Sequence, residues 1–201
     1  MFVQVIQGKI ADVDGLRSAV ESWRDTVATE VSGWLGTTGG AAADGTAIAV
    51  VRFESAEAAR RNSDRPEQQQ WWAQARQYFA GEVTFHDCVD VVTFLDGGSD
   101  DAGFVQIIQG RTSDADRMRD LLEQSEKALH DHRPEIIGGL VALHGDGGFT
   151  QVVYFTSEAA AREGERRETP AELKELDDEA AALFSDATFF DLTRPWLFSP
   201  R

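Results

Sequence analysis

Apolar residues alternate between strand-like and helix-like spacing along the first half of the chain. Residues 2–7 form a short apolar run that is rich in β-branched side chains and ends at Gly8, which predicts a buried strand. Over residues 12–29 apolar side chains recur every three or four positions, and this spacing predicts a helix with one apolar face. Its apolar positions are Leu16, Val20, Trp23 and Val27.

The rest of the first half predicts a hairpin, two more helices and a closing strand. Glycines loosen the first hairpin strand, Ser55 is suited to cap a helix, and Pro66 suits the first turn of another. The expected elements are a strand at 33–40, a strand at 46–53, a helix at 56–62, a helix from Pro66 to about residue 79, and one long strand at 82–95. The predicted order is β-α-β-β-α-β.

The same pattern then restarts. The segment Phe-Val-Gln-Val-Ile-Gln-Gly at residues 2–8 returns as Phe-Val-Gln-Ile-Ile-Gln-Gly at residues 104–110, 102 residues later. Near the end of each half Asp87 corresponds to Asp191, now 104 residues later. A carboxylate that recurs in both halves favours a structural hydrogen bond made twice, although two carboxylates facing each other across a pseudo-two-fold axis stay open.

The repeat divides the chain into residues 1–95 and 104–201, joined by an acidic, glycine-rich linker at 96–103. Each repeat is expected to be a ferredoxin-like α+β unit with its helices on one face of an antiparallel sheet. Because the strands are apolar on both faces, the bare face also needs a partner. We therefore expect the two sheets to pack face to face as a pseudo-dimeric α+β barrel. The tail is expected to be docked by Trp196.

Composition narrows the classes of function. The 201 residues carry a formal charge of −16 with a pI near 4.5, and such a surface repels nucleic-acid phosphates and anionic lipid. Cys88 is the only cysteine, which excludes an intrachain disulfide. The chain shows neither a signal-peptide pattern nor an apolar run of the roughly 20 residues that span a membrane. We expect a cytoplasmic protein, and further homo-oligomers stay open.

These features resemble the dimeric α+β barrel superfamily, specifically its antibiotic-biosynthesis-monooxygenase-like domains. The resemblance rests on the βαββαβ order, on the strand Gly33-Trp34-Leu35-Gly36, and on the strand-to-helix junction Phe53-Glu54-Ser55-Ala56-Glu57-Ala58. It covers both halves, so the chain resembles a fused tandem version. The family includes cofactor-free oxygenases of polycyclic phenols, haem-degrading enzymes and proteins of unknown role.

Aromatic and hydrogen-bonding side chains are concentrated in the first half. A cleft lined by Trp34, Trp72, Tyr78 and His86 would stack a flat aromatic ligand and orient a phenol. His86 would act as a general base near neutral pH. The resemblance implies polar and aromatic residues near the second helix, and Asn62, Trp72 and Tyr78 are the nearest matches. The catalytic candidates are therefore His86, Asn62 and Trp72, and the substrate-binding candidates are Trp34 and Tyr78.

Each of these side chains also has a simpler interpretation. Tryptophan and tyrosine at helical spacing are more often packing residues than ligand contacts, and a lone strand histidine is more often a hydrogen-bonded structural residue. His130 and His132 lie two positions apart at the end of a helix and point apart, so a shared metal is not expected.

The haem-degrading relatives imply an Asn at the end of the first strand, a Trp in the second helix and a His soon after it. Here Gln7 or Gln109 stands at the first position and Gln70-Trp71 at the last, so haem degradation is not expected. No cofactor is expected either. Two hypotheses remain: a cofactor-independent monooxygenase acting on a small aromatic or polyketide-type molecule, and a non-catalytic small-molecule-binding or stress-associated barrel protein.

Overall fold

In the computed structural model, which describes residues 1–200, the N-terminal half and the C-terminal tail fold together. This first unit comprises Met1–Val89 and the residues from Arg194 onward. Its elements are β1 (Phe2–Ile10), α1 (Val13–Thr26), a 3-10 turn (Ala28–Glu30), β2 (Trp34–Ala41), β3 (Thr46–Phe53), α2 (Ala56–Ser63), α3 (Pro66–Ala75), a second 3-10 turn (Arg76–Tyr78), β4 (Phe79–Cys88) and β10 (Trp196–Phe198). The strands form one antiparallel sheet in the order β10-β2-β3-β1-β4.

The remaining residues, Asp90–Thr193, form the second unit. Its elements are β5 (Asp90–Phe94), β6 (Phe104–Thr112), α4 (Ala115–His132), β7 (Ile136–Leu143), β8 (Gly148–Phe155), α5 (Glu158–Arg166), α6 (Ala171–Leu183) and β9 (Phe184–Leu192). Its antiparallel sheet has the order β5-β7-β8-β6-β9. The two strand orders are the same once each strand is replaced by its counterpart in the repeat.

The local signals that set the helix starts recur at the same places in both units. Asp12 caps α1 by accepting the backbone N–H of Gly15 at 2.9 Å, and Asp114 caps α4 in the same way at 2.9 Å. Ser55 and Ser157 cap α2 and α5 through their hydroxyl oxygens. Caps that repeat in this way give each half the same helix boundaries.

The register of the strands repeats as well. Phe2 pairs with Phe53 and Phe104 with Phe155, and β2 and β7 each carry a bulge after their first residue. Gly36 sits in the first of these bulges at φ +138°, a conformation that favours glycine. The predicted fold class, α+β with two ferredoxin-like repeats and antiparallel sheets, is confirmed. The face-to-face packing of the two sheets stays a prediction.

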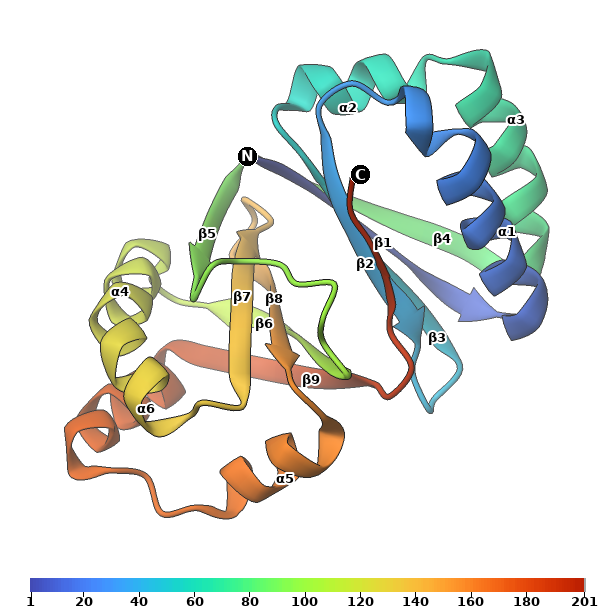
Figure 1. Cartoon of the computed structure of the whole chain (residues 1–201). Helices are drawn as coiled ribbons and strands as arrows, with labels where there is room; N and C mark the ends of the chain where they lie inside the picture. Colours follow the sequence, from blue (N-terminus) through green and yellow to red (C-terminus); the bar gives the residue numbers. More distant parts are fainter. Residues whose placement is uncertain (201) are drawn as a thin grey trace. The chain divides into compact units, whose positions relative to one another are not determined.

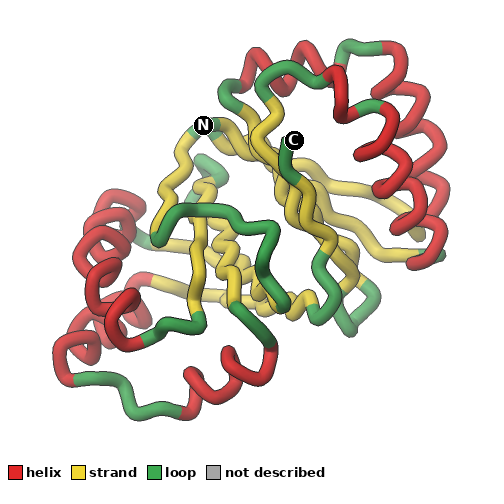
Figure 2. The backbone as a smooth tube through the Cα atoms, in the orientation of Figure 1, coloured by secondary structure: helices red, strands yellow, loops and turns green. Residues whose placement is uncertain are grey.

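Each unit places its helices along one face of its sheet (Figures 1 and 2). The core of the first unit lies between these layers and is built largely from aromatic residues, among them Phe2, Trp23, Trp34, Phe53 and Trp196. The core of the second unit contains Phe104, Met118, Val141, Phe149 and Phe155 instead. Among the described residues, no helix is both long and apolar enough to cross a membrane.

The single strand predicted at residues 82–95 is wrong. The strand begins earlier, at Phe79, and breaks at the exposed Val89; its first part, β4, stays in the first sheet while β5 pairs with β7 in the second. In return, the tail forms β10 and pairs with β2 (Figure 1). Each repeat thus donates its last strand to the sheet of the other unit. The division at 1–95, 96–103 and 104–201 remains our proposal for the ancestral repeats.

The recurring carboxylates make the structural bond that the repeat predicted. Gln4 donates its amide N–H to Asp87 Oδ1 at 2.8 Å, and Gln106 donates to Asp191 Oδ1 at 2.9 Å. Both bonds join the edge strand of a sheet, β4 or β9, to the strand beside it, β1 or β6. The side-chain amide of Gln4 is thereby fixed in orientation.

Candidate functional site

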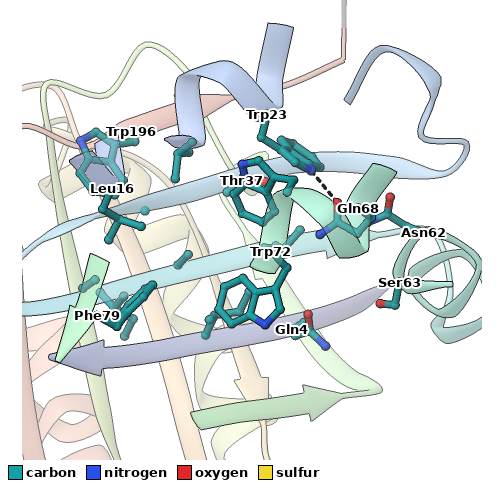
Figure 3. Close-up of a pocket in the computed structure, with 18 of the residues that line it drawn as sticks. Gln4, Leu16, Trp23, Thr37, Asn62, Ser63, Gln68, Trp72, Phe79 and Trp196 are labelled. Atoms are coloured by element: carbon teal, nitrogen blue, oxygen red, sulfur yellow. Dashed lines mark hydrogen bonds between the residues drawn. The ribbon is translucent and has the colours of Figure 1, made fainter. Parts of the chain in front are cut away.

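A cavity of about 100 Å³ lies in the first unit, between the sheet and its helices (Figure 3). Its floor is formed by sheet residues, mainly Gln4, Ile6, Thr37, Gly39, Ala47, Ala49 and Val51. Its roof and walls come from the helices and the flanking strands, mainly Leu16, Val20, Trp23, Asn62, Gln68, Trp71, Trp72, Phe79 and Trp196. We call this space the first-unit cavity.

The floor is hollow because small residues face each other across two strands. Gly39 of β2 pairs with Ala49 of β3, and Ala41 pairs with Ala47 two positions along. A Cβ atom at Gly39 would lie only 3.3 Å from the Ala49 Cβ, so this pair is already packed as closely as small residues allow. The space between this part of the sheet and the helices is therefore open to the side chains that the helices direct toward the sheet.

The helices project three tryptophans toward this space. The rings follow one another with centroid separations of 6.1 Å between Trp23 and Trp71 and 6.0 Å between Trp71 and Trp72. The indole N–H of Trp23 donates to Gln68 Oε1 at 2.6 Å, and that of Trp71 donates to the Ala19 carbonyl at 2.8 Å (Figure 3 shows the first bond). With these N–H groups bonded within the protein, the ring surfaces supply an apolar, aromatic wall.

Asn62 is the polar side chain at the cavity whose position needs an explanation. It is only 6% exposed, at the end of α2, and its Oδ1 atom has no hydrogen-bond partner among the described residues. A buried unsatisfied oxygen costs about 1–3 kcal/mol. Such a group in a native fold is commonly matched by a ligand or by ordered water. The first-unit cavity therefore offers one buried hydrogen-bond acceptor against aromatic walls.

None of the described residues that line the cavity carries an ionisable side chain. Its polar groups are the amides of Gln4, Asn62 and Gln68 and the hydroxyls of Thr37 and Ser63. Because a charge buried without a partner is strongly disfavoured, this lining selects an uncharged molecule. It also places no side-chain base in direct contact with a bound molecule.

The structure brings two of the five predicted site residues to the cavity. Asn62 and Trp72 both line it. Trp34 lies one layer behind, 5% exposed, edge-on to Trp23 with centroids 5.1 Å apart and with its indole N–H donated to Thr37 Oγ1 at 3.1 Å. Trp34 thus supports the wall from behind, because it holds both Trp23 and the floor residue Thr37.

Tyr78 and His86 lie outside this lining. The backbone carbonyl of Tyr78 accepts the N–H of Ala11 at 2.8 Å, and its ring covers Gly15, so Tyr78 anchors the start of α1. His86 pairs with Val5 across β1 and β4, one position from the pair of Ile6 with Phe85. Paired residues share a sheet face and neighbours alternate, so His86 faces away from the helices whereas Ile6 lines the cavity.

Sequence reasoning missed Gln4, Gln68, Trp23 and Trp196 as lining residues. A comparison of the repeats contains a signal for Trp23, which is Ser125 in the second half, but none for Gln4, which recurs as Gln106. Trp196 could not be found in this way, because its place in the first unit depends on the strand exchange.

The second unit holds a carboxylate where the first holds the Asn62 amide. Gly164 is the repeat counterpart of Asn62, and a Cβ atom there would lie 1.8 Å from Glu135 Oε1. The Glu135 side chain is 4% exposed and is paired with Arg133 and Arg167, the latter at 3.3 Å. Burial opposes ionisation of Glu135, but hydrogen bonding and charge from Arg133, with the charge of Arg167, outweigh it and lower the pKa below its usual value.

This pKa shift predicts an acid-sensitive contribution to stability. Because the folded-state pKa of Glu135 is lowered, its contribution is complete above the ordinary value of 4.5 and is lost as the pH falls through the folded-state value. Glu135→Gln removes the titration. We therefore expect the difference in unfolding free energy between wild type and Glu135→Gln, measured by denaturant titration with far-UV circular dichroism, to be largest near pH 7 and to shrink below about pH 4.5. A difference that is independent of pH would contradict it.

The fold of this chain is that of solved proteins named for monooxygenase activity. A candidate monooxygenase from Lactobacillus acidophilus is 14% identical, with a TM-score of 0.74 over 98% of this chain and 95% of that one. A candidate monooxygenase from Fusobacterium nucleatum is 9% identical, with a TM-score of 0.75 over 100% and 95%. An anthrone oxidase-like protein is 10% identical, with a TM-score of 0.64 over 98% and 92%.

No family model matches the sequence, and no curated protein matches it. At identities this low, the structural likeness shows the fold alone. That fold, two ferredoxin-like α+β repeats in tandem, is the one that the resemblance found in the sequence implied.

Proposed function

We propose that the first-unit cavity binds a small, uncharged aromatic molecule and that the protein is a cofactor-independent monooxygenase of that molecule. The observation that carries the proposal is the buried Asn62 Oδ1, left without a partner among the described residues, on a side chain that lines the same cavity as Trp71 and Trp72. The cavity measures about 100 Å³, and since a cavity of about 150 Å³ accepts benzene, it limits the ligand to at most one small ring.

The reaction class follows from the chemistry that needs no cofactor. An activated methylene group is converted to a ketone by R₂CH₂ + O₂ → R₂C=O + H₂O. Two C–H bonds break, one oxygen atom becomes the carbonyl oxygen, and the other leaves as water. All the electrons that reduce dioxygen come from the substrate carbon, so the protein needs only to bind, orient and exclude water.

Asn62 and Trp72 have distinct proposed roles in this reaction. The Asn62 amide carries an acceptor oxygen and a donor NH₂ group, so it can bond an enol hydroxyl or an enolate oxygen of the substrate. The Trp72 ring, which lies edge-on to Phe85 with centroids 5.4 Å apart, stacks on the aromatic ring and shields it from water. Anthrone, the molecule in the name of the anthrone oxidase-like neighbour, serves as the larger test compound, because its three fused rings exceed the single ring that the cavity favours.

The alternative is a binding protein without catalysis, and one observation favours it. No ionisable side chain is present among the described residues that line the cavity, and a dry apolar site raises the pKa of a bound phenol. The substrate proton must then leave to water or to a basic substrate group. A binding protein would saturate with the same ligands and consume no dioxygen.

Asn62→Leu separates binding from folding. Leucine removes the unsatisfied oxygen and fills a similar volume, so we expect the first unit to become more stable by about 1 kcal/mol. The same change should weaken binding and oxygenation by about tenfold, because one substrate hydrogen bond is lost. The matched control is Gln106→Leu, which removes a side-chain amide from the second unit.

The measurement is dioxygen uptake with anthrone and with 2-indanone, a smaller ketone with activated methylene groups, alongside denaturant titrations followed by tryptophan fluorescence. Binding of these molecules without dioxygen uptake would favour the binding-protein alternative. Loss of turnover in His86→Ala, together with normal turnover in Asn62→Leu, would place the reaction on the opposite sheet face and contradict the proposal.

A further inference from the structure

The floors of the two units differ at the positions that create the cavity. Ala47 in the first unit corresponds to Phe149 in the second, because Ala47 pairs with Gly8 and Phe149 pairs with Gly110, the repeat counterpart of Gly8. In the same way Gly39 corresponds to Val141. Two of the smallest residues in the first floor are thus a large aromatic ring and a branched side chain in the second.

The Phe149 ring occupies the space that is hollow in the first unit. Phe149 is 1% exposed and belongs to the core of the second unit. Its ring lies 5.1 Å, centroid to centroid, from that of Phe184, and a Cβ atom at Gly110 would lie 3.1 Å from its edge. The side chain therefore fills the layer between the sheet and the helices from below.

The second unit also lacks the side chains that would contact a ligand in the first-unit cavity. The Asn62 counterpart is Gly164, and the space beside it is taken by the Glu135 carboxylate with its two arginines. The counterpart of Trp23 is Ser125. On the exchanged strands, Val92 pairs with Val141 where Trp196 pairs with Gly39, so the second unit carries valine in place of the tryptophan wall.

We infer that each chain binds one ligand, in the first unit only, and that Ala47 is the specificity-determining residue that admits its ring. The inference rests on the binding part of the proposed function. In the second unit Phe149 performs the packing that a ligand completes in the first unit. The cavity that the second unit holds beside Gly164 is lined by charged side chains, among them Arg133, Arg167 and Asp177, and lacks a tryptophan wall. Ala47 has this role because its side chain lies in the cavity floor, where Phe149 shows that the fold accepts a full aromatic ring.

The test uses 4-fluorophenol as the probe, titrated into the full chain and followed by ¹⁹F NMR and by calorimetry. Wild type should bind one equivalent. Ala47→Phe should raise the dissociation constant at least about tenfold, because the ring of the new side chain occupies the binding space. Two equivalents bound by wild type, or unchanged affinity in Ala47→Phe, would overturn the inference.

Smaller and reciprocal changes keep the test valid if Ala47→Phe folds poorly. Ala47→Val should weaken binding by an intermediate factor, since it fills part of the same space. In the second unit, Phe149→Ala combined with Val141→Gly reproduces the small floor, and a second equivalent of benzene, which needs no hydrogen bond, should then bind. If the double variant binds one equivalent or none while its circular dichroism remains native, Ala47 and Gly39 do not create the site.

The result also separates this inference from the proposed function. Binding of one equivalent that is lost in Ala47→Phe, without dioxygen uptake, supports the inference and removes the oxygenase assignment. Dioxygen uptake that survives in a folded Ala47→Phe variant places the reaction elsewhere and removes the inference. If wild type binds none of 4-fluorophenol, benzene, anthrone and 2-indanone, both this inference and the proposed function are contradicted.

Discussion

Replacing Trp196 by alanine is expected to lower the unfolding free energy of the first unit by about 3–5 kcal/mol, the usual cost of removing a buried tryptophan. Trp196 is 9% exposed and belongs to the aromatic core of that unit, although it follows the whole second unit in the sequence. It is carried there by β10, a strand of only 3 residues that pairs with β2. The same substitution should enlarge the first-unit cavity and weaken its wall.

The measurement uses a property of the sequence. All five tryptophans, at positions 23, 34, 71, 72 and 196, lie in the first unit, so tryptophan fluorescence reports the unfolding of that unit alone. The matched control is Val92→Ala on β5, the corresponding strand of the other sheet, where the half-buried valine should contribute about 1 kcal/mol to the second unit and leave the fluorescence transition unchanged. A fluorescence midpoint that is unchanged in Trp196→Ala would show that β10 adds nothing to this core.

Gly164→Ala is expected to reverse the usual sign of a glycine-to-alanine change in a helix. In an unobstructed helix the change stabilises by up to about 1 kcal/mol. Here the new Cβ atom would lie 1.8 Å from Glu135 Oε1, and the carboxylate is held by Arg133 and Arg167. Because the buried ion pairs must break or shift, we expect a net loss of about 2 kcal/mol.

Removing the obstacle should restore the ordinary sign. In a Glu135→Ala background the Arg133 guanidinium, whose Nη2 atom lies 2.8 Å from the same Cβ position, is no longer held by the carboxylate and can move aside. Gly164→Ala should then stabilise the second unit by up to about 1 kcal/mol, so the two positions are strongly coupled in a double-mutant cycle. Denaturant titration followed by far-UV circular dichroism measures each variant, and the tryptophan transition of the first unit serves as an internal reference. Equal effects of Gly164→Ala in both backgrounds would mean that Glu135 moves aside at no cost.

The sequence was sufficient for the repeat, the fold class and most helix boundaries, because these depend on local spacing and on caps such as Asp12 and Asp114. It was not sufficient for the strand exchange. The run from Val83 to Leu95 contains neither glycine nor proline, and nothing in its composition shows that the chain changes sheets at Val89. Strand propensity shows that a segment is extended. Which sheet the segment joins depends on which sheet has an unpaired edge strand nearby, and local sequence does not show this.

Of the predicted site residues, only those on helices line the cavity, because the face of a helical residue follows from the sequence and the face of a strand residue does not. Asn62 and Trp72 lie on helices, whose cavity-facing side follows from spacing of three or four residues. His86 lies on a strand, where the face alternates with every residue and a choice between faces requires the register with β1. Tyr78 is at the helix-to-strand junction, where side-chain direction follows from neither period.

The exchange of terminal strands also sets the order in which the chain can be completed on the ribosome. The second unit is continuous from Asp90 to Thr193, so all of its strands are made before β10. The first unit is interrupted and lacks β10 until residues 196–198 emerge. N-terminal domains generally fold first during translation. In this protein the second unit can complete its sheet first, while the first unit lacks only its last strand.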